Sequence, residues 1–321
     1  MKILITEPVI KSAVQKLQNH FEVTIGNRGE FDNVDALKAA SQDFDGFLTM
    51  LSNPLTRDVF KAATKLKVVS NYAVGYNNID LDAAREFGVR IANTPGVLTE
   101  STAEIALSLL LSVARHTTEA EKQVRNRQFN GWHPTGFLGL ELFGATLGII
   151  GMGRIGQAFA RKAHACGMKI LYHNRNQIDQ AREEKLQARY MPDLDRMLEE
   201  IDALSIHCPL TDETRHLIDR RRINLMKNHV VIVNTSRGPV IDEDALADAL
   251  KQGQVGGAGL DVYEHEPTIH PELYNTPNTV LLPHIGSATV KSRRAMGDLS
   301  ADAIIGVLTG KPEHTIPNLL T

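Results

Sequence analysis

The sequence predicts an α/β fold of two doubly wound, parallel-sheet domains, and three observations support this prediction. Short apolar runs rich in β-branched residues recur along the chain, separated by longer segments with helical spacing. The length of 321 residues exceeds what one ordinary hydrophobic core fills and suits two domains. A turn-rich connection at residues 131–136 divides the strand-like runs into two sets.

The first set predicts a flavodoxin-like sheet within the first hundred residues. Its strand candidates are Lys2–Thr6, Glu22–Thr24, Gly46–Thr49, Val68–Asn71 and Val89–Ala92. The pattern then becomes helical. Ser101 and Glu104 have the spacing of a capping box, which predicts an apolar helix that starts at Ser101 and runs to about His116. A second helical stretch extends to about Phe129.

The second set predicts another parallel sheet. Its strand candidates are Leu147–Ile150, Lys169–Tyr172, Ala203–His207, Val230–Asn234, Gly256–Leu260 and Val280–Leu282. A last helix, from about Val290 to Thr309, follows this sheet, so we expect it to pack on the first domain. The prediction is therefore a discontinuous domain of residues 1–98 plus 288–321, an inserted domain of residues 99–287, and a cleft between the two.

Composition excludes several classes of protein. There are 35 basic and 38 acidic residues, a net charge of 35 − 38 = −3, so no nucleic-acid partner is expected. Cys166 and Cys208 lie in apolar stretches and are interpreted as core residues in a reducing compartment. No apolar run approaches the roughly 18 residues of a membrane span, and none resembles a signal peptide, so a cytoplasmic location is expected. No cluster has the spacing of metal ligands, so no metal is expected.

A glycine fingerprint predicts a dinucleotide site. Gly151, Gly153 and Gly156 follow a strand candidate and open a helix expected from about Ile155 to Ala165. Such glycines let the backbone approach a pyrophosphate, and the helix N-terminus supplies amide donors. The alternative is a glycine-rich turn without a ligand.

The end of the next strand candidate favours NADP as the cofactor. His173, Asn174, Arg175 and Asn176 follow Tyr172, and no acid occurs before Asp179. An acid at this place would accept the ribose hydroxyls of NAD, whereas Arg175 can pair with a 2′-phosphate and Asn174 can donate to it. We therefore expect NADPH to be preferred, with NAD as the alternative if Arg175 only solvates the strand end.

Three further strand ends carry a coherent set of chemical groups. Arg237, Glu266 and His284 each follow a strand candidate, and such ends form the ligand-binding edge of a parallel sheet. Reduction of a 2-keto acid requires a cation for the substrate, a proton donor and a hydride. Arg237 and His284 can fill the first two roles, and Glu266 can orient the imidazole and favour its protonated form. Each residue alone has another interpretation: Arg237 could form a surface ion pair, Glu266 could be a solvated loop acid, and His284 could be a hydrogen-bonding residue at a strand end.

With these motifs in order, the chain resembles the D-isomer-specific 2-hydroxyacid dehydrogenase family over essentially its full length. Within that family it is most similar to glyoxylate and hydroxypyruvate reductases and to relatives that reduce 2-ketogluconate. The matching segments are 73–80, 93–99, 151–156, 207–210, 234–238, 259–267 and 283–289.

The resemblance implies roles for individual residues. Arg237, Glu266 and His284 would be catalytic, with His284 as acid/base, and backbone amides around Val74 and Gly75 would bind the substrate carboxylate. Asp261 would hold the nicotinamide carboxamide. The other implied cofactor contacts are Thr102, Arg154, Ile155, Cys208, Pro209, Thr214, Thr235, Ser236 and Gly286.

The resemblance also implies a homodimer. The helix from Ser101 would be its dimerisation element, although an ordinary buried helix has the same pattern. Trp132 and His133 could reach a substrate pocket, either in their own subunit or across the dimer interface. The alternative for Trp132 is that it stabilises the fold. His116 and His207 are interpreted as structural.

The expected reaction is NADPH-preferring reduction of glyoxylate to glycolate and of hydroxypyruvate to D-glycerate, with 2-ketogluconate as a further candidate acceptor. Two alternatives remain. One is a nucleotide-sensing binding protein, because transcriptional corepressors resemble this family. The other is a formate or phosphite dehydrogenase, and Glu266 argues against formate because formate enzymes replace this residue.

Overall fold

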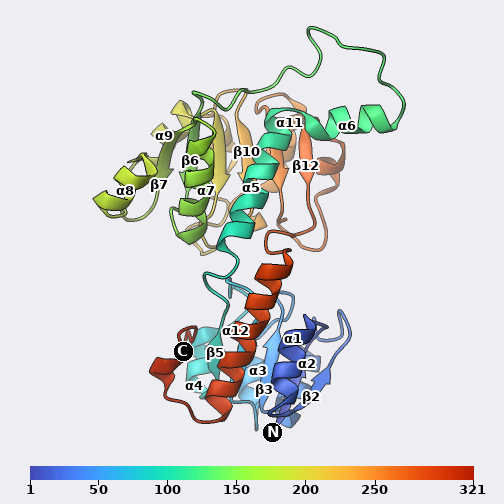
Figure 1. Cartoon of the computed structure of the whole chain (residues 1–321), viewed down its shortest axis with the longest axis vertical. Helices are drawn as coiled ribbons and strands as arrows, with labels where there is room; N and C mark the ends of the chain where they lie inside the picture. Colours follow the sequence, from blue (N-terminus) through green and yellow to red (C-terminus); the bar gives the residue numbers. More distant parts are fainter. The chain divides into compact units, whose positions relative to one another are not determined.

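The computed structural model describes residues 1–321 and contains two compact units (Figure 1). The terminal unit consists of Met1–Leu98 and Ser287–Thr321, and the central unit consists of Thr99–Gly286. Each unit has a single all-parallel sheet flanked by helices, so the predicted α/β fold class is confirmed. None of the helices combines the length and the apolar composition that crossing a membrane requires.

The terminal unit has a five-stranded sheet in the order β2-β1-β3-β4-β5, which is the flavodoxin order. Its strands are β1 (Lys2–Ile5), β2 (Glu22–Ile25), β3 (Gly46–Thr49), β4 (Val68–Asn71) and β5 (Arg90–Ala92). Its helices are α1 (Lys11–Gln18), α2 (Val34–Asp43), α3 (Arg57–Ala62), α4 (Leu81–Glu86) and α12 (Val290–Leu308), with a 3₁₀ turn η3 at Glu313–Thr315. The buried strands are apolar on both faces because helices cover both.

The chain's C-terminal segment completes the terminal unit, as the sequence predicted for the last helix. Helix α12 packs against α1, β3 and β4 (Figure 1). The tail then returns to the edge of the sheet, where the Leu320 amide donates to the Ile91 carbonyl at 2.7 Å. On the opposite face, α2, α3 and α4 bury Leu37, Phe60 and Ala83 against the strands.

The central unit has a seven-stranded sheet in the order β12-β11-β10-β9-β6-β7-β8. Its strands are β6 (Thr146–Ile150), β7 (Lys169–His173), β8 (Ala188–Tyr190), β9 (Ala203–Ile206), β10 (Val231–Asn234), β11 (Gly257–Leu260) and β12 (Thr279–Leu281). The order reverses between β6 and β9, and this switch point is where doubly wound sheets bind ligands. Strand β8 was not predicted because it is a short edge strand without a fully buried residue.

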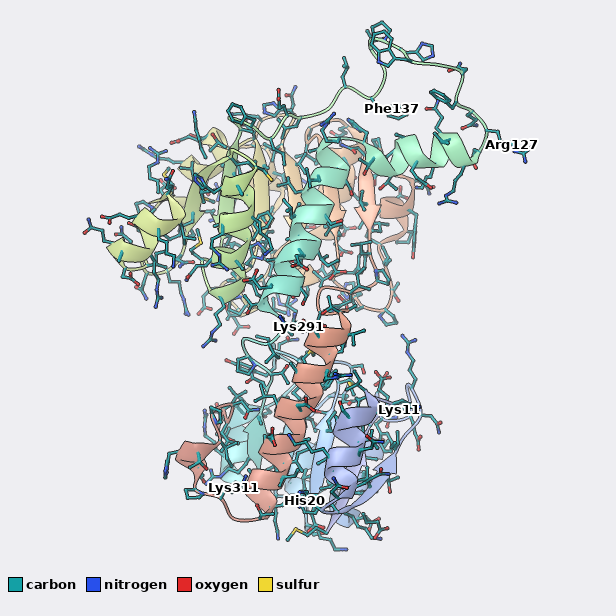
Figure 2. All side chains as sticks on the ribbon, in the orientation of Figure 1. Lys11, His20, Arg127, Phe137, Lys291 and Lys311 are labelled. Carbon is teal, nitrogen blue, oxygen red and sulfur yellow. The ribbon has the colours of Figure 1, made fainter.

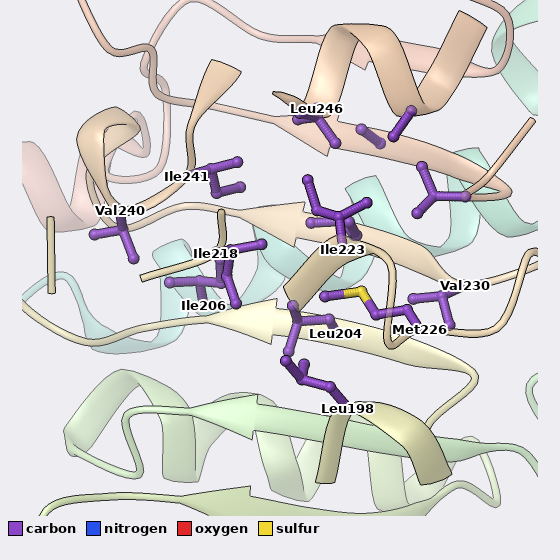
Figure 3. Packing of buried hydrophobic residues seen from close by; sticks show 14 of the residues in the cluster. Leu198, Leu204, Ile206, Ile218, Ile223, Met226, Val230, Val240, Ile241 and Leu246 are labelled. Carbon is purple, nitrogen blue, oxygen red and sulfur yellow. The ribbon is translucent and has the colours of Figure 1, made fainter. Parts of the chain in front are cut away.

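Helices cover both faces of the central sheet. They are α5 (Thr99–Ala114), α6 (Thr117–Arg125), α7 (Arg154–Ala165), α8 (Gln180–Leu186), α9 (Leu194–Glu200), α10 (Arg220–Ile223) and α11 (Glu243–Lys251), with 3₁₀ turns η1 (Gly238–Val240) and η2 (Pro271–Asn275). Helices α5 and α7 pack side by side on one face. On the other face Leu198, Ile223 and Leu246, from three helices, pack over Leu204 and neighbouring strand residues (Figure 3).

One helix start differs from the prediction. Helix α5 begins at Thr99, so Ser101 and Glu104 lie inside the helix rather than at its N-cap. Ser101 is buried in the first turn. The capping-box spacing was therefore coincidental, because the preceding Val97-Leu98 segment continues directly into the helix.

Candidate active site

Three adjacent strands of the central sheet carry Arg237, Glu266 and His284 on the loops that follow them. Strands β10, β11 and β12 are neighbours and run parallel. Their carboxyl ends therefore lie at one edge of the sheet. The loops after β11 and β12 are hydrogen-bonded to each other, and the loop after β10 lies in close contact with the loop after β11, so the tertiary structure brings the predicted residues together.

His284 and Glu266 form the most direct contact of this edge. The Nδ1 atom of His284 lies 2.8 Å from Oε2 of Glu266, and the other carboxylate oxygen accepts from the Tyr263 amide at 3.0 Å. Burial alone would raise the pKa of Glu266, but the hydrogen bond and charge of His284, with the Tyr263 amide and Arg237, outweigh it and lower that pKa. The carboxylate is thus held ionised beside the imidazole.

The second ring nitrogen of His284 takes no part in the contact with Glu266. His284 Nε2 makes no hydrogen bond within the chain, and the side chain is 35% exposed. The residue has φ 55°, a left-handed conformation that is uncommon for a residue with a side chain. Asp261 fixes the backbone that follows His284, because its two carboxylate oxygens accept hydrogen bonds from the amides of Ile285 and Gly286, each at 2.7 Å.

Arg237 belongs to a turn that is tied to strand β10. Its carbonyl accepts from the side-chain amide of Asn234 at 2.9 Å, and the Ser236 amide donates back to the Asn234 oxygen at 3.0 Å. The Arg237 guanidinium donates to the Ser236 carbonyl at 2.6 Å. Burial lowers the pKa of Arg237, while the nearby Glu266 carboxylate opposes that effect. A guanidinium remains charged at any working pH, so a partly desolvated cation lies beside Glu266.

Asp261 is the buried acid of the site, and its burial raises its pKa, opposed by the amides of Ile285 and Gly286 and the charge of His284. Gly286 lies against it closely: a Cβ there would meet Asp261 Oδ2 at 3.1 Å and Thr102 Cγ2 at 3.3 Å. The predicted cofactor residues Asp261, Gly286 and Thr102 therefore form one cluster, with Thr102 contributed by α5.

The glycine fingerprint fits a pyrophosphate. Gly151 has φ 96°, and a Cβ there would meet the Cys208 amide nitrogen at 2.4 Å, so the turn after β6 presses on the strand-end loop of β9. A Cβ at Gly153 would meet nothing within 4 Å, so the backbone is open to a ligand at that point. Helix α7 begins at Arg154, and Ile155 lies in its first turn, where amide groups lack helical acceptors.

The remaining predicted cofactor residues lie on the loops after β9 and β10. Ser236 Oγ donates to the Cys208 carbonyl at 2.8 Å and so joins the loop after β10 to the loop after β9, and Thr214 Oγ1 donates to the Pro209 carbonyl at 2.7 Å within the loop after β9. The hydroxyl of Thr235 is buried and has no partner in the chain. An unpaired buried hydroxyl at this edge fits a site that is completed by a bound polar molecule.

The end of β7 is arranged differently from the simplest expectation. The side-chain oxygen of Asn174 accepts from the Met152 amide at 2.7 Å and so supports the fingerprint turn. Its amide nitrogen donates to nothing in the chain and remains free for a ligand. Arg175 is exposed, and its charge contributes to lowering the pKa of Glu213, after the larger effects of the Thr211 hydroxyl and the Glu213 backbone. Arg175 therefore lies near the loop after β9.

In the terminal unit, Val74 and Gly75 lie on the loop after β4. The amides of Val74, Gly75 and Tyr76 donate to no acceptor in the chain. Successive unpaired amides at a strand end form the kind of concavity that binds anions. The side chains of Asn71 and Asn93 donate to carbonyls of this loop, and both asparagines are buried at the ends of β4 and β5. Neither role was predicted from the sequence, because a buried asparagine at the end of an apolar strand has no periodic pattern.

The other residues singled out in the sequence have structural surroundings. His207 is fully buried, its pKa is lowered to about 3 by burial, and its ring packs on Phe159. His116 has a left-handed conformation at the start of α6. Burial raises the pKa of Cys208 to about 12, so the thiol stays protonated. No group of three or more His, Cys, Asp or Glu side chains could hold a metal ion.

Trp132 does not stabilise the fold of this chain, because it is 83% exposed. Figure 2 shows the segment between Arg127 and Phe137 running out from the body of the central unit. Helix α5, by contrast, buries Ala106, Leu110 and Val113 inside that unit.

These features define a dinucleotide-binding oxidoreductase with a histidine–carboxylate pair and a neighbouring arginine at its strand ends. Residues 107–286 match the model of the D-isomer specific 2-hydroxyacid dehydrogenase, NAD binding domain. The chain is 44% identical to a glyoxylate reductase of Thermococcus onnurineus over 99% of this chain and 96% of the relative. The chain belongs to the D-isomer-specific 2-hydroxyacid dehydrogenase family.

Solved structures agree with this assignment. A Thermus thermophilus protein matches with a TM-score of 0.92 and 38% identity, covering all of both chains. The NADPH-dependent glyoxylate/hydroxypyruvate reductase of Sinorhizobium meliloti, in complex with NADP and malonate, matches with a TM-score of 0.86 and 33% identity. That match covers 96% of this chain and 94% of the other.

Proposed function

We propose that the chain catalyses NADPH-preferring reduction of small 2-keto acids: glyoxylate to glycolate and hydroxypyruvate to D-glycerate, with 2-ketogluconate as a further candidate acceptor. The observation that carries the proposal is the His284–Glu266 pair. One ring nitrogen is fixed by a carboxylate at 2.8 Å, while the other is unpaired and the side chain is partly exposed. This is the arrangement that a positioned proton donor requires.

A reduced dinucleotide held in this site would supply the hydride that the keto carbon receives. His284, protonated on Nε2, donates that proton to the carbonyl oxygen, so the new alcohol gains one hydride and one proton and the ring becomes neutral. Glu266 keeps Nδ1 of the ring hydrogen-bonded throughout and stabilises the imidazolium before transfer. Solvent then returns a proton to the ring.

Arg237 binds the anionic acceptor. Its guanidinium is partly desolvated, so its attraction for a carboxylate or for a polarised keto oxygen is stronger than that of a solvated surface arginine. The same charge stabilises negative charge that develops on the oxygen during hydride transfer. The unpaired amides of Val74 and Gly75 bind the substrate carboxylate.

The residues of the central unit would hold the cofactor along its length. Gly153 and the first turn of α7, with Arg154 and Ile155, would bind the pyrophosphate. Asp261, with Gly286 and Thr102 beside it, would bind the nicotinamide carboxamide, and Cys208, Pro209, Thr214, Thr235 and Ser236 would line the remaining contact. The free amide nitrogen of Asn174 and the exposed Arg175 would meet the 2′-phosphate, and the absence of an acid at this strand end supports NADPH over NADH.

We also propose that the protein is a homodimer. The segment after α6 exposes large apolar side chains that its own unit does not cover: Phe129, Trp132, Leu138 and Phe143. The last three are 83%, 71% and 79% exposed, and several large exposed apolar side chains on one segment are typical of a surface that another chain covers.

The decisive experiment is initial-rate oxidation of NADPH and NADH, side by side, with glyoxylate, hydroxypyruvate and 2-ketogluconate as acceptors. Faster turnover with NADPH supports both the reaction and the role of Arg175. Equal or faster use of NADH keeps the reaction and refutes the cofactor preference. No turnover with any pair refutes the reaction.

A further inference from the structure

Three consecutive carbonyls of the loop after β4 are hydrogen-bonded to groups at the sheet edge. The Ala73 carbonyl accepts from the Thr94 amide at 2.8 Å. The Val74 carbonyl accepts from the side-chain amide of Asn93 at 2.7 Å, and the Gly75 carbonyl accepts from that of Asn71 at 2.8 Å. Two of the three donors are therefore side chains.

These contacts also determine the directions of the N–H groups in the same peptide bonds. In a planar trans peptide the C=O and N–H groups point in opposite directions. The N–H of Gly75 therefore points away from Asn93, and the N–H of Tyr76 points away from Asn71. Neither amide, nor that of Val74, has an acceptor in the chain. The asparagines thus turn carbonyl oxygens away from the face on which the amides are free.

Both asparagines are themselves fixed and inaccessible. Asn71 is 0% exposed and Asn93 is 5% exposed, so neither side chain can contact a ligand. The Thr49 hydroxyl donates to the side-chain oxygen of Asn71 at 3.2 Å, which defines the end of the amide that faces Gly75. Asn318 donates to the main-chain carbonyl of Asn93 at 2.8 Å and anchors it to the C-terminal tail.

We propose that Asn71 and Asn93 are positioning residues that make the loop of Val74, Gly75 and Tyr76 a receptor for the substrate carboxylate. Without a donor beneath it, each peptide can rotate and present its carbonyl oxygen to the anion, which it repels. The inference rests on the proposed function for the identity of the anion. It adds that Tyr76 contributes an amide and that two buried side chains set the affinity for the acceptor.

The kinetic test uses Asn71→Asp and Asn93→Asp, which replace the donor with an acceptor, and the neutral variant Asn71→Leu, which excludes an effect of charge alone. Asn278→Asp is the matched control, because Asn278 donates to the Gly256 carbonyl at 2.7 Å within the central unit and not to the loop after β4. We expect KM for glyoxylate and the inhibition constant of oxalate to rise on the order of tenfold or more in the first three variants, as for loss of a hydrogen bond to a charged group. The NADPH dissociation constant of these variants should change by less than about twofold, and so should KM and the oxalate inhibition constant of the control variant. Folded Asn71→Leu and Asn93→Asp proteins with unchanged KM and oxalate inhibition would overturn the proposal.

A second measurement needs no variant. The chain has 6 tyrosines, so ¹⁵N-tyrosine labelling gives a sparse amide spectrum. Titration with oxalate should shift the Tyr76 amide selectively, and an unmoved Tyr76 resonance at saturating oxalate would overturn the inference. Because oxalate binding requires no turnover, a wild-type protein that reduces no keto acid but shows this shift would refute the proposed reaction and leave the anion receptor standing.

Discussion

Gly238 lies so close to Tyr263 that a Cβ at position 238 would stand 1.8 Å from the Tyr263 carbonyl carbon. Gly238 directly follows Arg237, and the Tyr263 amide donates to Glu266 at 3.0 Å. The turn that carries the arginine and the turn that carries the glutamate are therefore in direct main-chain contact, and only glycine permits it. This contact couples the positions of the two charged groups.

Gly238→Ala should displace both turns, because the overlap involves backbone atoms that cannot rotate away. We expect kcat to fall at least about a hundredfold and stability to fall by about 3 kcal/mol, the upper part of the usual range for overpacking. Gly136→Ala is the control, since a Cβ there makes only ordinary contacts at 3.5 Å. Thermal melting and steady-state rates measure both effects, and equal behaviour of the two variants would contradict the argument.

His284→Asn should remove the proton donor while keeping a side chain that tolerates the left-handed backbone at φ 55°. General acid catalysis typically contributes about 10²- to 10⁴-fold, so we expect kcat to fall within that range. NADPH affinity, measured by fluorescence titration, should stay nearly constant. His229→Asn, which changes an exposed histidine, provides the comparison. Near-normal turnover of the first variant would exclude His284 as the acid.

Arg175→Ala should reduce kcat/KM for NADPH on the order of tenfold or more and leave kcat/KM for NADH almost unchanged, because only NADPH carries the 2′-phosphate. Arg182→Ala is a suitable control, since Arg182 pairs with Asp179 at 3.0 Å on the neighbouring helix. Parallel losses with both cofactors would show that Arg175 supports the fold rather than cofactor choice.

Asp202 should make stability depend on pH. Burial alone would raise its pKa, but hydrogen bonds from Lys227, the Thr146 amide and His229 lower it to about 2. A lowered folded-state pKa stabilises the protein above the ordinary value near 4, and the contribution is lost as pH falls toward about 2. It amounts to at most about 2 kcal/mol, reduced by solvent at the partly exposed oxygens.

Urea unfolding of wild type and Asp202→Asn tests this sign. The difference in unfolding free energy should be constant between pH 7 and pH 5 and should shrink to about half near pH 3. A difference that grows as the pH falls would contradict the assignment.

Trp132 offers a direct measure of assembly because it is the only tryptophan of the chain. Its indole is 83% exposed in one chain, so burial in a dimer should shift its emission to shorter wavelength, and dilution should reverse the shift. Sedimentation equilibrium of wild type and Phe143→Ser gives an independent value. A monomer with solvent-exposed emission at all concentrations would refute the proposed homodimer.

The sequence was sufficient for most of the architecture because both sheets are parallel and buried. Apolar strands covered by helices on both faces appear as short runs rich in β-branched residues, and all eleven predicted strands are present with bounds that differ by at most one residue at either end. Strand β8 was not predicted, because its half-exposed position at the edge of the sheet leaves no such apolar run in the sequence. The start of α5 was predicted two residues too late because Ser101 and Glu104 have capping-box spacing, although both lie inside the helix that begins at Thr99.

The sequence by itself determined the fold class, the dinucleotide fingerprint and the residues Arg237, Glu266 and His284, because strand ends of a parallel sheet collect at one edge whatever the details of packing. Only the tertiary structure decided that Gly238 and Tyr263 touch, that Asp261 holds the amides after His284, and that Asn71 and Asn93 orient the loop of Val74. Most of those relationships join residues 19 to 25 positions apart in the chain, and each depends on single hydrogen bonds or close approaches. Such contacts leave no periodic pattern, because they depend on where the folded backbone places one atom.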